Sequence, residues 1–421
     1  LPTILAFQLI GRLRSRHRWI CRVVLLYFSF VYLPFKSYVP AIHLRDLLSI
    51  ILNIRVQEFS VTERGLVVKI NLSAKKVSAV FIAASLAAGA GFTSAAHAAP
   101  ETLNVYAALD YSTDVTKGFT AKTGIPVNLV ALSTGPLLAK IQAEANNPQW
   151  GIYWADGAEP CAAFDLAKTL LPYQSKGARF NPIGLKLQPK SHAYTVPGYT
   201  EMVGVVYNSA KIAAPTSWND LLTATYKGKV GMNNPSISGP TFPFIAGLMD
   251  QFGGEQAGKD YLTKLKANGL VVNAKNGPTL HALEVGNIQV ALVQSSAAIN
   301  EVATFKAKPV AGFAPKITFL SKTTVLPSCL AIDSKATAGQ QTAAKQFVDY
   351  VLSPEGQELM AKGAPAGDSL FWPALQGRNP IAGVTSVPTP TFASGKVVIV
   401  NPYTWGPLQG EIDDWFTKNI A

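Results

Sequence analysis

Strand-like and helix-like segments alternate after residue 100, and this alternation constrains the fold more than any other feature of the chain. The first strand, TLNVYAAL, is short and apolar, and the amphipathic helix after it ends at Gly124. A second strand and helix follow in the same order. A β-α-β-α opening is typical of a parallel sheet in an α/β protein. We therefore expect strands at 102–109 and 125–132 and helices at 112–124 and 133–148.

A long extended segment at 194–207 separates this opening from a second α/β block. The segment is longer than an ordinary strand, as is typical of a connector that crosses between two domains. The second block occupies 229–295, and the chain is then extended at 315–333 before it returns to helices. Residues 99–421 are numerous enough for two domains, each with its own core.

The segment in front of residue 99 has the pattern of an export signal. Lys75 and Lys76 are followed by an apolar run at 77–90, and Ala96 and Ala98 frame a small-x-small cleavage site. The apolar run is too short to span a bilayer. A buried alanine-rich helix is the alternative, but it does not explain the change to strand-like sequence after Ala99.

The signal begins unusually far into the chain, which leaves residues 1–66 to be explained. Only thirteen uncharged residues separate Arg22 from Lys36, fewer than a spanning helix needs. We therefore expect 1–66 to be a spurious upstream extension of the reading frame and 67–98 to be the signal peptide. A membrane anchor is the alternative for the first segment.

The basic character of the chain comes from these leading residues. The net charge is +12 overall, but residues 99–421 hold 25 Lys or Arg and 22 Asp or Glu, a balance of +3. Basic residues are scattered singly in that part, without a basic stripe. The composition therefore predicts no nucleic-acid partner.

The sequence after residue 98 contains no recognisable catalytic or metal-binding motif. It has no G-x-S-x-G, H-E-x-x-H or Cys-x-x-Cys pattern, and its two histidines, His192 and His281, lie far apart. Residues 253–259 match the frame of a phosphate loop, but Asp260 replaces the Ser or Thr that would hold magnesium. We expect no catalytic residues, no metal and no cofactor.

Cysteine usage is compatible with export. Only Cys161 and Cys329 follow the expected cleavage site, and an even pair in an exported chain can form a disulfide. Two separate buried thiols are an equally acceptable interpretation of the sequence.

Small polar residues open three of the expected helices. Such turns expose unpaired N–H groups at the positive end of the helix dipole, which attracts anions. Ordinary helix capping explains any one of them, but three at strand ends in two domains favour a binding site. The turns are Ser133-Thr134-Gly135, Ser238-Gly239 with Thr241, and Asn276-Gly277.

Several phrases, in order, resemble the extracellular solute-binding proteins of ABC importers, in the branch that includes ferric-iron, phosphonate and hexose-phosphate binders. The similarity covers about 101–375. It is carried by LNVYAAL, FTAKTGIPVNLVALSTGPLLAKIQAEANNP, GVVYNSAKI, PTSWNDLL, YKGKVGMNNPSISGPT and AAKQFVDYVLSPEGQELMAKGAPAG.

The resemblance implies a two-lobed α/β clamshell, the type II "Venus flytrap", with crossover hinge strands. Lobe 1 would comprise 99–200, lobe 2 would comprise 201–315, and 316–421 would return to lobe 1 and add C-terminal helices. The family further implies a non-enzymatic, monomeric periplasmic receptor that delivers a small-molecule solute to an inner-membrane ABC permease.

The resemblance also bears on the ligand. Ferric members carry two adjacent tyrosines after a strand that corresponds to 290–294, and phenolate oxygens suit Fe(III). Here Ser295 and Ser296 occupy that stretch, and no Tyr-Tyr pair follows residue 98. Hydroxyl groups favour hydrogen bonding to an organic or oxyanion ligand.

Three further residues are candidates for the cleft. Asp156 matches a cleft loop of the family and would pair with a ligand amine, or else cap its own loop. Tyr111 and Tyr199 would line the cleft, or else pack in the core or hinge. We therefore expect a receptor for a phosphonate, phosphate ester or carboxylate, anionic or zwitterionic. The alternatives are a ferric-iron or polyamine receptor of the same fold, and an exported enzyme.

Overall fold

The computed structural model describes residues 56–62, 65–70, 100–363, 370–380, 383–384 and 395–421. The chain divides into two compact units, Leu1–Ala96 and His97–Ala421. In the first unit, β1 (Val56–Thr62) pairs antiparallel with β2 (Gly65–Ile70). The expected signal peptide at 67–98 lies outside the described residues except for 67–70. No helix in the described ranges combines the length and the apolar character that a membrane crossing requires.

The second unit begins with three parallel strands, the first two of which correspond to the strands that the sequence predicts. The strand order in lobe 1 is β4-β3-β5, followed by β12. Helices connect these strands, as parallel neighbours require. The elements are β3 (Leu103–Ala107), α5 (Ser112–Thr123), β4 (Val127–Ala131), α6 (Thr134–Ala143), β5 (Ile152–Asp156), α7 (Glu159–Leu166), α13 (Ala338–Val351) and α14 (Pro354–Gly363).

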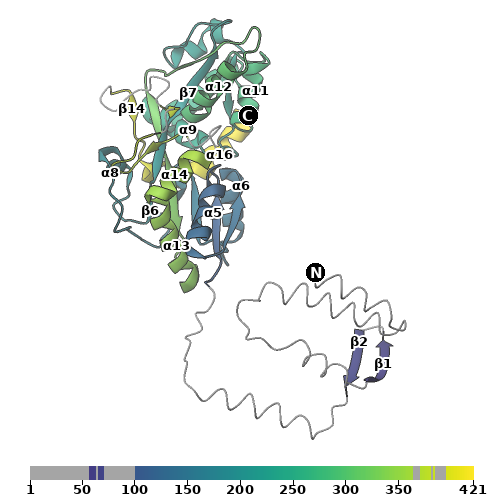
Figure 1. The fold of residues 1–421 in the computed structure, drawn as a ribbon. Coiled ribbons are helices and arrows are strands. Elements are labelled where there is room, and N and C mark those ends of the chain that lie inside the picture. Colours follow the sequence, from purple (N-terminus) through teal and green to yellow (C-terminus); the bar gives the residue numbers. More distant parts are fainter. Residues whose placement is uncertain (1–55, 63–64, 71–99, 364–369, 381–382, 385–394) are drawn as a thin grey trace. The chain divides into compact units, whose positions relative to one another are not determined.

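A second parallel set forms lobe 2. β8 pairs parallel with both β9 and β10, and β10 pairs antiparallel with the long strand β7. Figure 1 shows α9, α11 and α12 around this set, away from α5, α6 and α13 of lobe 1. The elements are β7 (Gly198–Asn208), β8 (Val230–Asn233), α9 (Thr241–Phe252), α10 (Glu255–Ala267), β9 (Val271–Asn273), α11 (Asn276–Glu284), β10 (Val290–Gln294), α12 (Ser295–Ala307) and β11 (Pro315–Thr318).

Two strands run through both lobes. In β12 (Thr323–Ile332), residues 328–332 pair with β5 of lobe 1, whereas 324–327 pair with the first half of β7. The second half of β7 pairs with β10 of lobe 2. The expected two-lobed α/β clamshell with crossover strands is thus confirmed, and β7 and β12 are its hinge.

Short elements complete the unit. They lie in the connections between the larger helices and strands. They are α8 (Pro182–Leu187), β6 (Tyr194–Thr195), η3 (Asn219–Leu222), η4 (Ala224–Tyr226), β13 (Trp372–Pro373), β14 (Val397–Val398), α15 (Pro402–Trp405), η7 (Gly406–Leu408) and α16 (Gln409–Asn419).

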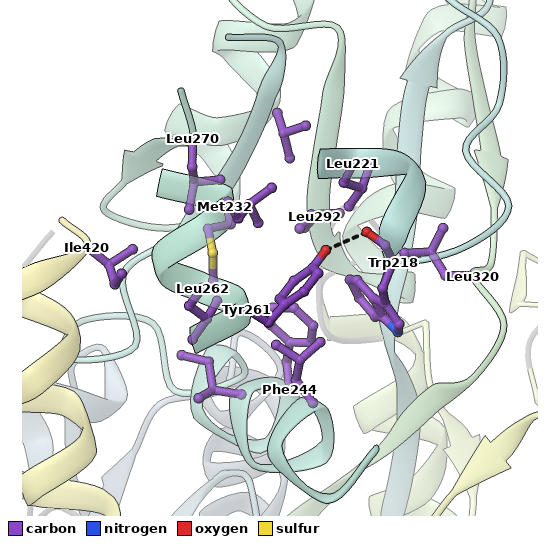
Figure 2. Close-up of a cluster of buried hydrophobic side chains, with 14 of the residues drawn as sticks. Trp218, Leu221, Met232, Phe244, Tyr261, Leu262, Leu270, Leu292, Leu320 and Ile420 are labelled. Atoms are coloured by element: carbon purple, nitrogen blue, oxygen red, sulfur yellow. Dashed lines mark hydrogen bonds between the residues drawn. The ribbon is translucent and has the colours of Figure 1, made fainter. Parts of the chain in front are cut away.

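Each lobe has an apolar core. In lobe 1, Phe119 of α5, Trp154 of β5 and Phe347 of α13 are fully buried and pack edge to face. In lobe 2, Tyr261 packs among aliphatic and aromatic side chains and its hydroxyl group donates to the carbonyl oxygen of Trp218 at 2.7 Å, as Figure 2 shows. This bond satisfies the polar atom of a buried tyrosine.

The C-terminal helix belongs to the core of lobe 2. Ile412, Phe416 and Ile420 are fully buried in the same cluster as Met232 and Leu262, and Ile420 is labelled in Figure 2. The sequence predicts C-terminal helices within 316–421 without assigning them to a lobe, because no pattern in α16 itself indicates which sheet its apolar face covers.

The segment before α16 bridges the two lobes. The hydroxyl group of Tyr403 donates to Asp165 Oδ2 in lobe 1 at 2.8 Å, and Trp405 Nε1 donates to Asp250 Oδ1 in lobe 2 at 2.9 Å. Directly after Trp405 the chain lies so close to α7 that a Cβ at Gly406 would be 2.2 Å from the carbonyl oxygen of Glu159. Residues 402–408 are therefore a third connection between the lobes.

Candidate functional site

A cleft of about 710 Å³ lies where the two lobes face each other. Lobe 1 contributes the residues that follow β3, β4 and β5, and lobe 2 contributes the beginning of α9, one face of α11 and the first turns of α12. All these positions lie at the carboxyl ends of parallel strands, where α/β proteins bind their ligands.

The three small-polar turns that the sequence predicts meet at this cleft. Ser133 and Thr134 line it from the start of α6. From lobe 2, the lining includes Ser238 and Gly239, which precede α9, and Asn276 and Gly277, which open α11. Helix N-termini of both lobes are therefore directed to one space.

Two other members of those turns are placed differently. Gly135 packs against the opposite lobe, where an added Cβ would be 1.8 Å from the carbonyl oxygen of Ser236. Thr241 is 1% exposed, and its Oγ1 has no hydrogen-bond partner among the described residues. Neither residue belongs to the cleft lining.

The buried side chain of Asn233, at the end of β8, holds the two lobe 2 turns together. Its Nδ2 donates to Asn276 Oδ1 at 2.7 Å and to Ser238 Oγ at 3.4 Å, and its Oδ1 accepts from Thr279 Oγ1 at 2.7 Å. Since Asn276 accepts at Oδ1, its NH₂ group is the part of the amide that can donate to a solute. The sequence analysis did not identify Asn233, although an asparagine at a strand end is a usable signal.

Ser112 is a further cleft residue that the sequence analysis missed. It is the first residue of α5, it lines the cleft, and it is only 1% exposed. Its Oγ has no hydrogen-bond partner among the described residues, which is costly for a buried hydroxyl group. Ser112 follows a strand, as the three predicted turns do. This position in the sequence is the feature by which it could have been predicted.

The cleft also contains several charged groups. Asp156 lines it at the end of β5, as expected, and Asp110 lines it from the loop after β3. Glu284 of α11 and Glu301 of α12 line the lobe 2 wall, and Lys275 precedes α11. Apart from Asp156, the sequence analysis did not select these residues, because isolated charges on a helix ordinarily face solvent.

Glu301 and Asp156 are the two buried residues among these charged groups, and the pKa of Glu301 is strongly shifted. Glu301 is 7% exposed, and its pKa is raised to about 7 by burial, then by the charge of Glu284 and by a hydrogen bond to that residue. Glu284 is also 3.3 Å, through Oε2, from Nδ1 of His281.

The two predicted aromatic residues lie beneath the cleft. Tyr111 is 2% exposed and packs against Trp154 and Phe371, with ring centroids 5.3 and 5.8 Å apart. Tyr199 is 6% exposed on the hinge strand β7. Both border a small cavity of about 10 Å³ that also touches Asp156.

The serines at the position of the ferric-branch tyrosines are buried. Ser295 and Ser296 open α12 with exposures of 2% and 0%, and Ser296 Oγ accepts from Gln294 Nε2 at 2.6 Å. The lining residues here are Gln294 and Ala297 instead. In the described part of the chain, no three His, Cys, Asp or Glu residues are grouped so that they could hold a metal ion.

The two lobes touch at one edge of the cleft. A Cβ at Gly239 would lie 2.0 Å from Oγ1 and 2.4 Å from Cβ of Thr134 in lobe 1, so only glycine fits this approach. Together with the packing of Gly135 on Ser236, this forms an interlobe contact between the turns 133–135 and 236–239.

The structure pairs the two cysteines of the second unit within lobe 1. Cys161 of α7 and Cys329 of β12 form a disulfide with their Cα atoms 6.5 Å apart. This separation is within the range that disulfides adopt.

Comparison with known proteins identifies relatives of both the sequence and the fold. The family described as bacterial extracellular solute-binding protein matches residues 114–389. An uncharacterized protein of Haemophilus influenzae is 26% identical over 347 residues, which are 77% of this chain and 91% of that protein.

A second relative has a name that points to a ligand. A periplasmic protein of Salmonella paratyphi A, whose name proposes 2-aminoethylphosphonate binding, is 29% identical over 174 residues. The match spans 41% of this chain and about half of that protein, 49%.

Among solved structures, the periplasmic binding protein AfuA of Actinobacillus pleuropneumoniae, with fructose-6-phosphate bound, has a similar fold. The TM-score is 0.63 at 20% identity, over 76% of this chain and 98% of AfuA. This similarity shows the shared two-lobed architecture.

Proposed function

The chain belongs to the family of bacterial extracellular solute-binding proteins, and we propose that the solute it carries to its ABC importer is a small anion or zwitterion bound between the lobes. The observation that carries this proposal is the convergence of helix N-termini on one cleft. Ser112, Ser133 and Thr134 open helices of lobe 1 there, and Ser238 precedes a helix of lobe 2. Such N-termini bind oxyanions through free N–H groups and the helix dipole.

Several side chains of the cleft are hydrogen-bond donors, which favours an oxyanion as the ligand. The hydroxyl group of Ser112 is buried without a partner, so an acceptor in the cleft would satisfy it. The NH₂ group of Asn276 and the ammonium group of Lys275 are further donors on the opposite wall. Phosphonate, phosphate ester and carboxylate groups all offer the acceptors that this set requires.

The mechanism that we propose is hinged closure. β7 and β12 connect the lobes, and the interlobe contact forms only when the turns of 133–135 and 236–239 approach each other. A solute that contacts both lobes stabilises the closed form and shifts the population toward it.

The alternatives have less support. A ferric site would need several hard anionic ligands around one ion. Carboxylates do line the cleft, but no three His, Cys, Asp or Glu of the described residues are grouped so that they could hold a metal, and Gln294 and Ala297 lie near the position of the ferric-branch tyrosines. An enzyme would need an activated nucleophile, and among the described residues no hydroxyl group donates to the ring of His281, the histidine of the cleft. A polyamine would bind to the carboxylates of the cleft and would leave the helix N-termini without an anionic ligand.

We further propose that the protein acts in the periplasm as a monomer without a nucleic-acid partner. In this proposal residues 67–98 are a signal peptide that is cleaved near Ala98, and the inner-membrane permease receives the solute from the closed form. The binding residues are those of the cleft named above, together with Tyr111 of lobe 1 and Tyr199 of the hinge strand β7, which border the small cavity at Asp156.

A thermal-shift screen of the exported protein tests the ligand class. A ligand at a hundred times its Kd stabilises the folded protein by ~2.7 kcal/mol, which such a screen detects. We expect hits among phosphonates, including 2-aminoethylphosphonate, phosphate esters and small carboxylates, and no gain from ferric citrate over citrate. Stabilisation only by polyamines or neutral sugars would refute the oxyanion proposal.

A further inference from the structure

One helix, α11, presents groups of opposite charge to the two ends of the cleft. Lys275 and Asn276 line the cleft at its N-terminal end, Leu280 and His281 line it one turn later, and Glu284 lines it at the C-terminal end. These positions share one face of a helix because they repeat every three or four residues. With a rise of 1.5 Å per residue, the backbone positions of Asn276 and Glu284 are about 12 Å apart along the axis, and the side chain of Glu284 leans toward the helix N-terminus, which shortens the distance that a solute must span.

The acidic end of this face continues onto α12. Glu301 lies one and a half turns into α12, lines the cleft beside Glu284, and is 7% exposed. No lysine or arginine among the described residues forms an ion pair with Glu301. A buried carboxylate without a cation is costly unless a partner is supplied from outside the chain.

The rise in the pKa of Glu301 has the same physical cause. Burial and the neighbouring carboxylate of Glu284 both disfavour its ionised form, and Glu284 in turn lies 3.3 Å, through Oε2, from Nδ1 of His281. A cation placed between Glu284 and Glu301 would remove both penalties at once.

The lobe 1 wall of the cleft supplies an independent sign of a ligand. Ser112 opens α5 in lobe 1 with a hydroxyl group that is buried and has no partner among the described residues. The same cleft thus has donors without acceptors in one part and a buried carboxylate without a cation in another. A single solute with two oppositely charged ends would satisfy both.

We propose that Glu301 and Glu284 are the ammonium-binding residues of the cleft, so that the solute is a zwitterion that lies along α11 with its oxyanion at the helix N-termini. This inference rests on the proposed function, which requires only the oxyanion. It assigns the specificity for an amine to two glutamates of lobe 2, and it makes simple anions poor ligands.

Matched pairs of ligands test the inference on the whole exported protein. The first pair is 2-aminoethylphosphonate and ethylphosphonate, and the second is β-alanine and propionate; the members of each pair differ in the amine. Titration calorimetry should show a preference of about tenfold or more for the amine in at least one pair, as expected for a hydrogen bond between charged groups.

Substitution of Glu301 separates the amine site from the rest of the cleft. Glu301→Gln should abolish the preference for the amine while the affinity for ethylphosphonate or propionate stays the same or rises. Glu284→Gln, at an exposed position, should reduce the preference in the same direction if the first variant does not fold. Glu411→Gln, on α16 and outside the cleft lining, is the matched control and should behave as the wild type.

The outcomes distinguish the two proposals. Equal affinity for both members of each pair in the wild type, or a preference that survives both glutamate substitutions, would overturn the amine site and leave the oxyanion site intact. Failure of all four ligands and of every other anion in the screen would overturn the proposed function, and this inference with it.

Discussion

Substitution of Gly239 by alanine should weaken solute binding without weakening the fold. Gly239 does not have a positive φ, so alanine is compatible with its backbone. The added Cβ would lie 2.0, 2.4 and 2.8 Å from Oγ1, Cβ and Cγ2 of Thr134, which belongs to the opposite lobe. The overlap therefore exists only when the lobes are together, and the open form can accommodate the methyl group.

The magnitude follows from the cost of overpacking. One extra methyl group in a closely packed contact costs about 1 to 3 kcal/mol when neighbouring atoms must shift. Since this cost falls on the closed form alone, the apparent Kd should rise by about 5- to 150-fold. The melting temperature of the ligand-free protein should stay within about 1 °C of the wild type, because the open form loses no contact.

Gly177→Ala is the matched control for this substitution. Gly177 lies in lobe 1 outside the cleft lining and lacks a positive φ, and no atom lies within 4 Å of the position that its Cβ would occupy. Calorimetry should show an unchanged Kd for the control, and small-angle scattering should show that the solute compacts the control but not Gly239→Ala. Unchanged affinity and full compaction in Gly239→Ala would refute the role of the interlobe contact in binding.

Three further predictions concern other parts of the chain. The pKa of Glu301 is raised from 4.5 to about 7, so the native state holds its proton more tightly and the stability from this group falls as the pH rises from about 4.5 to 7. Denaturant unfolding without ligand should therefore show Glu301→Gln to be more stable than the wild type above pH 7, by at most about 3 kcal/mol, and no gain there would contradict the buried charge. Cys161 and Cys329 should give no free thiol in unreduced, denatured exported protein, and two titratable thiols would exclude the disulfide. Mass spectrometry of the exported protein should find an N-terminus at or near Ala99, and peptides from residues 12–22 would argue against the upstream-extension prediction.

The architecture was predictable because its signals are local. Apolar strands alternate with amphipathic helices, and Gly124 ends the first helix with φ 73°, as a left-handed C-cap does. The long extended segment near Tyr199 predicted the crossover, and the structure places β7 across both lobes. Small polar residues before Pro136 and Pro240 indicated the two turns that now face each other.

The rest of the site depends on packing between distant segments. Nothing near Glu301 in the sequence differs from an ordinary solvated helix, and its burial comes from the position of α12 against the cleft. Ser112 resembled a common helix start, and only the unsatisfied hydroxyl group distinguishes it. Ser295 and Ser296 are polar and lie in the stretch that matched the family, but α12 begins against β7 and covers them: a Cβ at Gly204 would be 2.9 Å from Cα of Ser295.

Because the chain crosses between the lobes more than once, the order of synthesis limits when each lobe can fold. β12 joins the sheet of lobe 1 only after the whole of lobe 2 has been synthesised, and the core of lobe 2 lacks Ile412, Phe416 and Ile420 until the last turns of α16 emerge. Neither lobe can therefore complete its core before translation ends. The contacts that complete each core join residues far apart in the sequence, which slows folding. The nascent chain is therefore incompletely folded during translation. An incompletely folded chain is the form that a secretion channel can translocate.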